Sequence, residues 1–178
     1  VTATDCDSIT TLSDQTGNGF DLSAGTTSSS TYDADLINGN PGLDMPSGSQ
    51  LFETATDIPQ PATIFFIGAV TSTGASNDQP FAGGVDSISE GAFGEKNGYF
   101  RLLANNYPNV TASDTSLHIF SGLFDGTSSI LRIDGNEFSD VNAGSDNIVK
   151  LGLNGVDGGG RSPGLKAGQM LVYPQDKS

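Results

Sequence analysis

Short apolar or alternating segments recur along the chain, and turn-forming residues bound each of them. The 178 residues include 24 glycines, with many Ser, Thr, Asn and Asp, so long helices have little room. We find no convincing stretch of the 3.6-residue period of an amphipathic helix. The pattern predicts an all-β fold, with strands at 42–45, 50–54, 62–71, 79–82, 88–93, 98–104, 116–125, 129–134, 137–141, 148–153 and 168–173.

Two segments define this fold best. "TIFFIGAV", residues 63–70, is a continuous apolar run, as expected of a central strand covered on both faces. Residues 117–138 read as an antiparallel pair with Asp-Gly turns at 125–126 and 134–135. Alternation places one set of side chains on one face and a second set on the other: Leu117, Ile119, Ser121 and Leu123 against His118, Phe120, Gly122 and Phe124. We therefore expect two stacked antiparallel sheets.

Charge narrows the classes of partner. Twenty-one acidic and seven basic residues leave a net charge of −14, which disfavours nucleic acid as a partner, because nucleic-acid binders need clustered Lys and Arg.

No apolar run approaches the roughly 18 residues of a membrane helix, so membrane insertion is not expected. Cys6 is the only cysteine, which excludes an intrachain disulfide and a zinc cluster. No linker divides residues 1–178, which we interpret as one domain.

Six segments in chain order resemble the concanavalin A-like (laminin G-like) jelly-roll superfamily, in the form found in phage structural proteins and extracellular bacterial proteins. The resemblance implies an antiparallel β-sandwich, and it implies function less well, because this superfamily includes lectins, adhesion modules, glycosidases and lyases. The segments are "DQTGNGFD" (14–21), "NGNPGL" (38–43), "TIFFI" (63–67), "HIFSGLFDGTSSILRIDG" (118–135), "LGLNG" (151–155) and "LVY" (171–173).

Catalytic residues of the expected kinds do not form a recognisable pattern. Retaining glycosidases that resemble this fold place two Glu on one strand, with an Asp between them. The chain has four Glu, and none stands in such an arrangement: Glu53, Glu90, Glu95 and Glu137. His118, the only histidine, lies on a predicted core strand and is interpreted as structural. We therefore expect no enzymatic activity.

Candidate ligand-binding residues lie in two turn-like stretches. Tyr107 follows two Asn in "ANNYPNV", and Asp157 and Arg161 lie in the glycine-rich "NGVDGGGRSPG". Loops at the rim of a jelly roll commonly carry binding residues, and sugars bind to aromatic rings beside Asp, Asn and Arg. These three residues are the predicted ligand contacts.

One further stretch, "SDQTGNGFD", offers oxygen ligands. Asp14, Thr16 and Asn18 match the first ligand spacings of a helix-flanked calcium loop, but position twelve is Gly25 rather than Glu. That specific loop is excluded. Two readings stay open: a calcium site of another kind at Asp14, Asn18 and Asp21, or a turn whose side chains bond their own backbone.

The combined expectation is a non-catalytic binding or structural module that acts outside the cell or on a virion surface. It would be a tail-fibre or capsid-decorating protein, or a secreted adhesion protein, with a cell-surface glycan or a protein in a larger assembly as its partner. Oligomerisation is left open, and calcium is the sole cofactor considered. The alternative is a polysaccharide-degrading enzyme or its accessory carbohydrate-binding domain.

Overall fold

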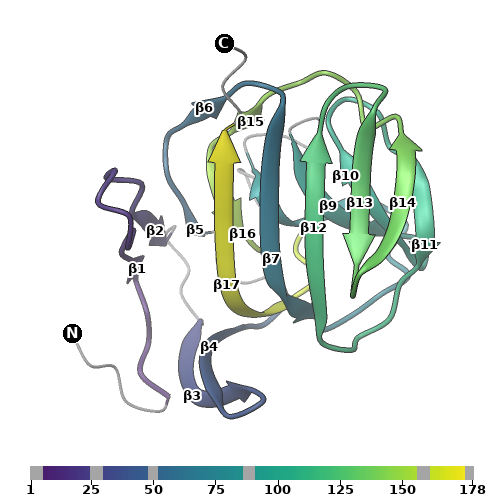
Figure 1. Ribbon diagram of the computed structural model, residues 1–178. Helices are drawn as coiled ribbons and strands as arrows, with labels where there is room; N and C mark the ends of the chain where they lie inside the picture. The colour runs from purple at the N-terminus through teal and green to yellow at the C-terminus, as the bar shows by residue number, and fades with distance from the viewer. Residues whose placement is uncertain (1–5, 25–29, 48–51, 86–90, 156–160, 175–178) are drawn as a thin grey trace.

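Strands of the chain pair in two stacked antiparallel sheets (Figure 1), as the sequence predicts. The computed structural model describes residues 6–24, 30–47, 52–85, 91–155 and 161–174. None of these residues lies in a helix, so this part of the chain offers no helix that could span a membrane. The all-β sandwich is thus confirmed.

The sheet nearer the viewer in Figure 1 has seven strands. Its centre is built from segments far apart in the sequence, because β7 pairs with β12 on one side and with β17 on the other. The spatial order is β14 (Asn136–Val141), β13 (Ser129–Ile133), β12 (His118–Phe124), β7 (Ala62–Val70), β17 (Leu165–Pro174), β4 (Asn40–Met45) and β3 (Thr31–Ile37).

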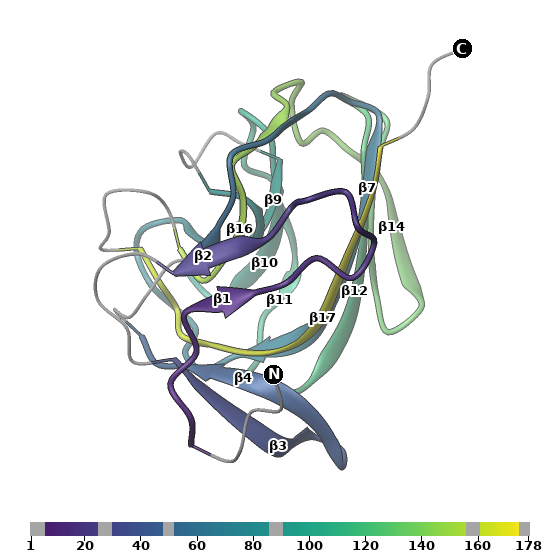
Figure 2. The ribbon, with the colours of Figure 1, turned by 90° about the vertical axis from the view of Figure 1, so that its left-hand side faces the viewer.

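The second sheet lies behind the first and has eight described strands. A separate pair, β6 (Asp57–Ile58) with β15 (Ile148–Val149), lies at one end of the sandwich (Figure 2 gives the side view). The order in the larger sheet is β1 (Thr11–Leu12), β2 (Leu22–Ala24), β5 (Phe52–Glu53), β16 (Leu151–Leu153), β8 (Gln79–Gly84), β9 (Ala92–Lys96), β10 (Tyr99–Leu103) and β11 (Asn109–Ala112).

Aromatic side chains from both sheets fill the space between them. Phe120 of β12 lies at the centre, 5.3 Å from the ring of Phe81 and 5.1 Å from that of Phe100. Phe120 and Phe124 are almost fully buried, whereas Ile119 on the other face is 56% exposed. The alternation predicted for β12 is therefore confirmed.

One prediction about β7 is wrong. The strand is central, but its outward face is not covered by the described chain, and Phe65 is 40% exposed. Apolar side chains on both faces are normally a sign of cover on both faces. Here the second sheet covers only the inner face, which carries the fully buried Ile64 and Phe66.

Candidate functional site

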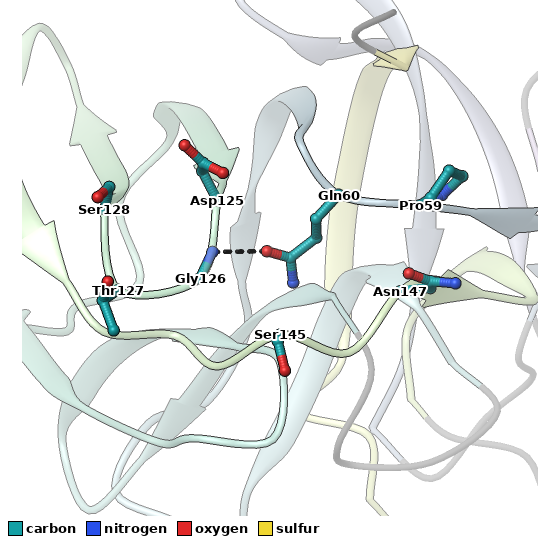
Figure 3. Close-up of a pocket in the computed structure, with 8 residues that line it drawn as sticks. All are labelled: Pro59, Gln60, Asp125, Gly126, Thr127, Ser128, Ser145 and Asn147. Carbon is teal, nitrogen blue, oxygen red and sulfur yellow. Dashed lines mark hydrogen bonds between the residues drawn. The ribbon is translucent and has the colours of Figure 1, made fainter. Parts of the chain in front are cut away.

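A polar groove lies at the end of the sandwich where β12 ends and β7 begins (Figure 3). The two strands are paired there, with Phe124 opposite Ala62. The groove has a volume of about 590 Å³, and three separate segments line it. The lining residues are Pro59 and Gln60 before β7, Asp125 to Ser128 in the β12–β13 turn, and Ser145 and Asn147 before β15.

Gln60 joins the three walls of the groove. Its side-chain oxygen accepts a hydrogen bond of 2.7 Å from the backbone N–H of Gly126, the contact drawn in Figure 3. Its amide nitrogen donates to the carbonyl oxygens of Gly144, at 3.2 Å, and Asp146, at 2.7 Å. The residue is only 9% exposed, so these bonds replace hydration that burial removes. Gln60 therefore holds the groove in one shape.

The turn on the far wall is fixed by its own hydrogen bonds. The buried Ser129 hydroxyl donates to the carbonyl of Gly126 and accepts from the N–H of Asp125. The side chains of Asp125, Thr127 and Ser128 are left exposed to solvent. The groove thus presents the hydroxyl groups of Thr127, Ser128 and Ser145 and the carboxylate of Asp125, which suits a ligand rich in hydroxyl groups.

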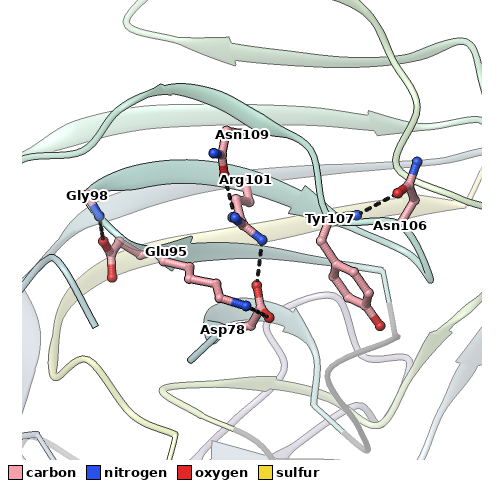
Figure 4. A network of polar contacts seen from close by, with 8 residues as sticks. Asp78, Glu95, Gly98, Arg101, Asn106, Tyr107 and Asn109 are labelled. Carbon is pink, nitrogen blue, oxygen red and sulfur yellow. Dashed lines mark hydrogen bonds and ion pairs between the residues drawn. The ribbon is translucent and has the colours of Figure 1, made fainter. Parts of the chain in front are cut away.

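A buried ionic network lies on the eight-stranded sheet (Figure 4). Arg101 of β10 donates to Asp78 at 2.9 Å and to the side-chain oxygen of Asn109. Lys96 binds the other oxygen of Asp78 at 3.0 Å. Arg101 and Asp78 are 7% and 5% exposed, so their charges face one another rather than solvent. This arrangement stabilises the sheet and leaves little room for a ligand.

Glu95 is also committed to the fold. It is fully buried, and one carboxylate oxygen accepts hydrogen bonds from the N–H groups of Gly74 and Gly98 and from the hydroxyl of Ser113. Glu53 and Glu137 lie on β5 and β14, which neighbour neither each other nor β9. Among the described residues, no two Glu are placed as a glycosidase pair.

His118 lies between two carboxylates at the end of β12 opposite the groove. Its Nδ1 is 2.6 Å from Asp134 and its Nε2 is 3.0 Å from Asp114. The ring packs edge-on against Phe100 and Phe120, and its side chain is 12% exposed. This environment agrees with the structural role predicted for His118.

The two predicted ligand contacts that the structure describes, Tyr107 and Arg161, are not brought together. Tyr107 is half-buried in the loop after β10, and this loop bonds to the segment that carries Ser145: the N–H of Asn106 donates to the carbonyl of Ala143. Arg161 precedes β17 at the opposite end, where β7 terminates. The nine residues of β7 separate these ends by roughly 25 Å. Asp157 lies outside the described residues.

The Asp14 stretch forms a turn closed by its own side chains. The Asp14 carboxylate accepts hydrogen bonds from the N–H groups of Thr16, Asn18 and Phe20 and from the Thr16 hydroxyl. The N–H of Asp14 donates in turn to Asp21 at 2.7 Å. These bonds, above all those from Thr16, lower the pKa of Asp14 to about 2. The geometry is that of the backbone-bonded turn, and a calcium ion here remains a prediction.

Sequence reasoning missed the groove. The sequence of its segments predicts only turns, such as "DGTSS" at 125–129. No sequence pattern around Gln60, which stands between Pro59 and Pro61, indicates a functional role. The distances along the chain are large: 66 residues separate Gln60 from Gly126, and 84 separate it from Gly144. Only the pairing of distant strands brings these segments together.

Comparisons with known proteins support the fold. The chain is similar to Trypanosoma rangeli sialidase in complex with the inhibitor DANA, with a TM-score of 0.60 and 10% identity over 98% of this chain. A second structure of Trypanosoma rangeli sialidase gives a TM-score of 0.57. A mutant of HCR/D gives 0.50 with 11% identity over 96% of this chain.

These likenesses cover only part of the other proteins. The chain spans 30% of the sialidase chain and 49% of the HCR/D chain. At such identities the comparison shows a shared β-sandwich architecture and nothing finer. No protein-family model and no curated protein sequence matches the chain.

Proposed function

We propose that the protein is a non-catalytic, concanavalin A-like module that binds carbohydrate in the groove beside Gln60. The observation that carries this proposal is the convergence of exposed hydroxyl and carboxylate groups from two segments onto one groove, whose walls Gln60 joins by hydrogen bonds. Sugars are recognised by such groups, each accepting from or donating to a hydroxyl. A fold shared with part of a sialidase agrees with a carbohydrate-related module.

Charge favours a neutral glycan. Asp125 is the one carboxylate among the described lining residues, and no basic side chain accompanies it. The net charge of −14 adds a repulsive field for any anionic ligand. Neutral oligosaccharides should therefore bind better than sialylated or uronic-acid chains.

The place of action is proposed from the surface and the resemblance together. A strongly acidic surface suits an exposed module, and the superfamily that the sequence resembles includes extracellular bacterial proteins and phage structural proteins. We propose an extracellular or virion-surface location, as an adhesion, tail-fibre or capsid-decorating protein. Antibody labelling of whole particles, culture medium and cell lysate would test this, and signal confined to the lysate would contradict it.

A glycan array, followed by calorimetry on its hits, tests the binding proposal. We expect neutral glycans to bind, and Asp125→Ala to weaken binding at least tenfold, because the carboxylate accepts charge-assisted hydrogen bonds. Asp35→Ala is the matched control: Asp35 is an exposed carboxylate on β3, away from the groove. Equal loss in both variants, or no hit on the array, would overturn the assignment of the groove.

The non-catalytic part of the proposal has its own measurement. The purified protein is incubated with a panel of polysaccharides, and new reducing ends are counted. We expect none above background. Release of reducing sugar that is lost in Asp125→Ala would instead identify a glycan-degrading enzyme.

A further inference from the structure

An apolar face covers the centre of the seven-stranded sheet on its outward side. We define the apolar face by six residues of β7, β12 and β17. Four are large and well exposed: Ile119 at 56%, Tyr173 at 52%, Phe65 at 40% and Leu171 at 37%. The full set is Phe65, Ile67, Ile119, Leu123, Leu171 and Tyr173.

Strand register makes these side chains neighbours. Ile119 lies opposite Ile67 across the β12–β7 ladder, and Phe65 lies opposite Leu171 across the β7–β17 ladder. The rings of Phe65 and Tyr173 meet edge-to-face, with centroids 6.0 Å apart. In Figure 1 this side of the sheet faces the viewer, and no described segment crosses in front of it. The apolar face is therefore continuous and open.

The absence of acids from this surface is unusual for the chain. The outward positions that lie among these six residues are uncharged: Thr63, Ser121 and Gln169. The exposed Lys166 of β17 lies farther along the strand, opposite Ala69 of β7 and Asp44 of β4. On the next strand Arg132 is neutralised by Glu137, whose carboxylate it binds at 2.9 Å. A chain with 21 acidic residues thus leaves one electrically neutral, apolar region.

We infer that the apolar face binds the same face of a second copy of this chain. A basic partner would be attracted by the net charge of −14 and would bind where the acidic side chains lie. The apolar face has no acidic side chain for such a partner to contact. The net charges of two copies repel one another, and this repulsion is weakest when the faces in contact carry no acidic side chains. A two-fold contact also needs one patch that complements itself, and a flat, neutral, apolar sheet face meets that requirement.

The available area is sufficient for a weak dimer. At roughly 200 Å² for a whole aromatic side chain and slightly less for Leu or Ile, the four well-exposed residues offer on the order of 350 Å². The four residues of two copies together offer about 700 Å², to which the flanking positions add, so the pair belongs with the small interfaces below roughly 1,200 Å² that are typical of weak association. Dissociation constants near micromolar are expected, and the apolar run of β7 would then be covered on both faces.

Sedimentation equilibrium of the intact chain, at roughly 1 to 300 μM and at low and high NaCl, tests this inference. We expect a monomer–dimer equilibrium that strengthens with salt, because salt screens the repulsion between two acidic proteins and does not weaken apolar burial. Ile119→Lys and Tyr173→Lys should each weaken the dimer at least tenfold. Circular dichroism confirms that each variant is folded.

Tyr99→Lys is the matched control. Tyr99 is 42% exposed on β10 of the other sheet, and the substitution changes the net charge by the same amount. A dimer that survives in this control and is lost in the other two variants supports the inference. A monomer at every concentration and salt, a dimer indifferent to Ile119→Lys and Tyr173→Lys, or association that weakens with salt would each overturn it. The result is independent of glycan binding.

Discussion

The Nδ1 atom of His118 lies 2.6 Å from Oδ2 of Asp134, a residue of the turn between β13 and β14. The other oxygen of Asp134 accepts a hydrogen bond of 2.9 Å from the backbone N–H of Ile119. One carboxylate therefore bonds both the imidazole ring of His118 and the backbone of β12. Burial lowers the pKa of His118, but the bonds to Asp134 and Asp114 outweigh burial and raise it from 6.5. The two carboxylates thereby favour the charged form of the imidazole.

This geometry predicts a two-sided pH dependence of stability. The stabilisation from His118 is complete below its unfolded pKa of 6.5 and is lost as pH rises through the raised folded pKa. Backbone bonds from Ile119 and Ser116, with His118, lower the pKa of Asp134 and Asp114, so their contribution is present above about 3.8 and is lost in acid. The melting temperature should therefore decline on both sides of this window.

The variant His118→Leu tests the loss of stability expected as pH rises. The variant keeps an apolar contact with Phe100 and Phe120 but removes both hydrogen bonds. We expect a loss of about 1 kcal/mol at pH 6 that becomes smaller by pH 9. Calorimetric melting of both proteins across this range measures it. A constant difference would show that charge on the ring has no part in stability.

Gln60→Leu is expected to lower the free energy of unfolding by about 1–3 kcal/mol, because it leaves a part-buried N–H and two part-buried carbonyl oxygens without their partner. Chemical denaturation measures this loss. Gln15→Leu, at an exposed glutamine, should change stability by less than about 0.5 kcal/mol. Equal effects would mean that the three bonds of Gln60 are not retained in solution.

Removal of Asp78 should be costly, because Arg101 would keep a buried charge without its carboxylate. We expect Asp78→Leu to lower the free energy of unfolding by about 3 kcal/mol. The double variant Asp78→Leu with Arg101→Leu should lose less than the single variant, since it buries no unpaired charge. Urea denaturation of both variants measures their free energies of unfolding. A double variant that is less stable than Asp78→Leu alone would contradict the energetic coupling between Asp78 and Arg101.

Calcium is tested by melting in excess EDTA. Because the carboxylate of Asp14 already accepts three backbone N–H groups, we expect the melting temperature to be unchanged. A bound ion would stabilise the fold by mass action, so added calcium would then raise the melting temperature. A calcium-dependent rise that disappears in Asp14→Ala would establish the metal site at Asp14, Asn18 and Asp21.

Sequence patterns within a few neighbouring residues predicted the strands that pair with their neighbours along the chain. Alternation in β12 and the Asp-Gly turns identified the β12–β13–β14 meander with its correct inward face. Of the strand expected at 88–93, residues 88–90 lie outside the described part of the chain. The described strand β9 continues to Lys96, where the Asn97-Gly98 turn, with positive φ at both residues, leads into its partner β10.

Strands with a polar sequence were harder to predict. β3, "TYDADLI", alternates weakly and carries two acids, so it does not read as a strand in isolation. β3 becomes a strand because it pairs with β4 in a hairpin, and the Asn38-Gly39 turn, with positive φ at both residues, connects the two. The groove could not be predicted for a related reason, because its walls meet only through contacts between distant segments.

The position of β17 has a consequence for how the chain folds. This strand spans Leu165–Pro174, yet it lies inside the seven-stranded sheet between β7 and β4, some hundred residues earlier in the sequence. The β3–β4 hairpin cannot join the sheet until β17 has arrived, and loop closure of that length is entropically costly. We therefore expect slow folding, on the millisecond-to-second scale, that is completed only after β17 has been synthesised. During that interval the β17-side edge of β7 is unpaired, which makes chaperone contact or aggregation a kinetic competitor of the native state.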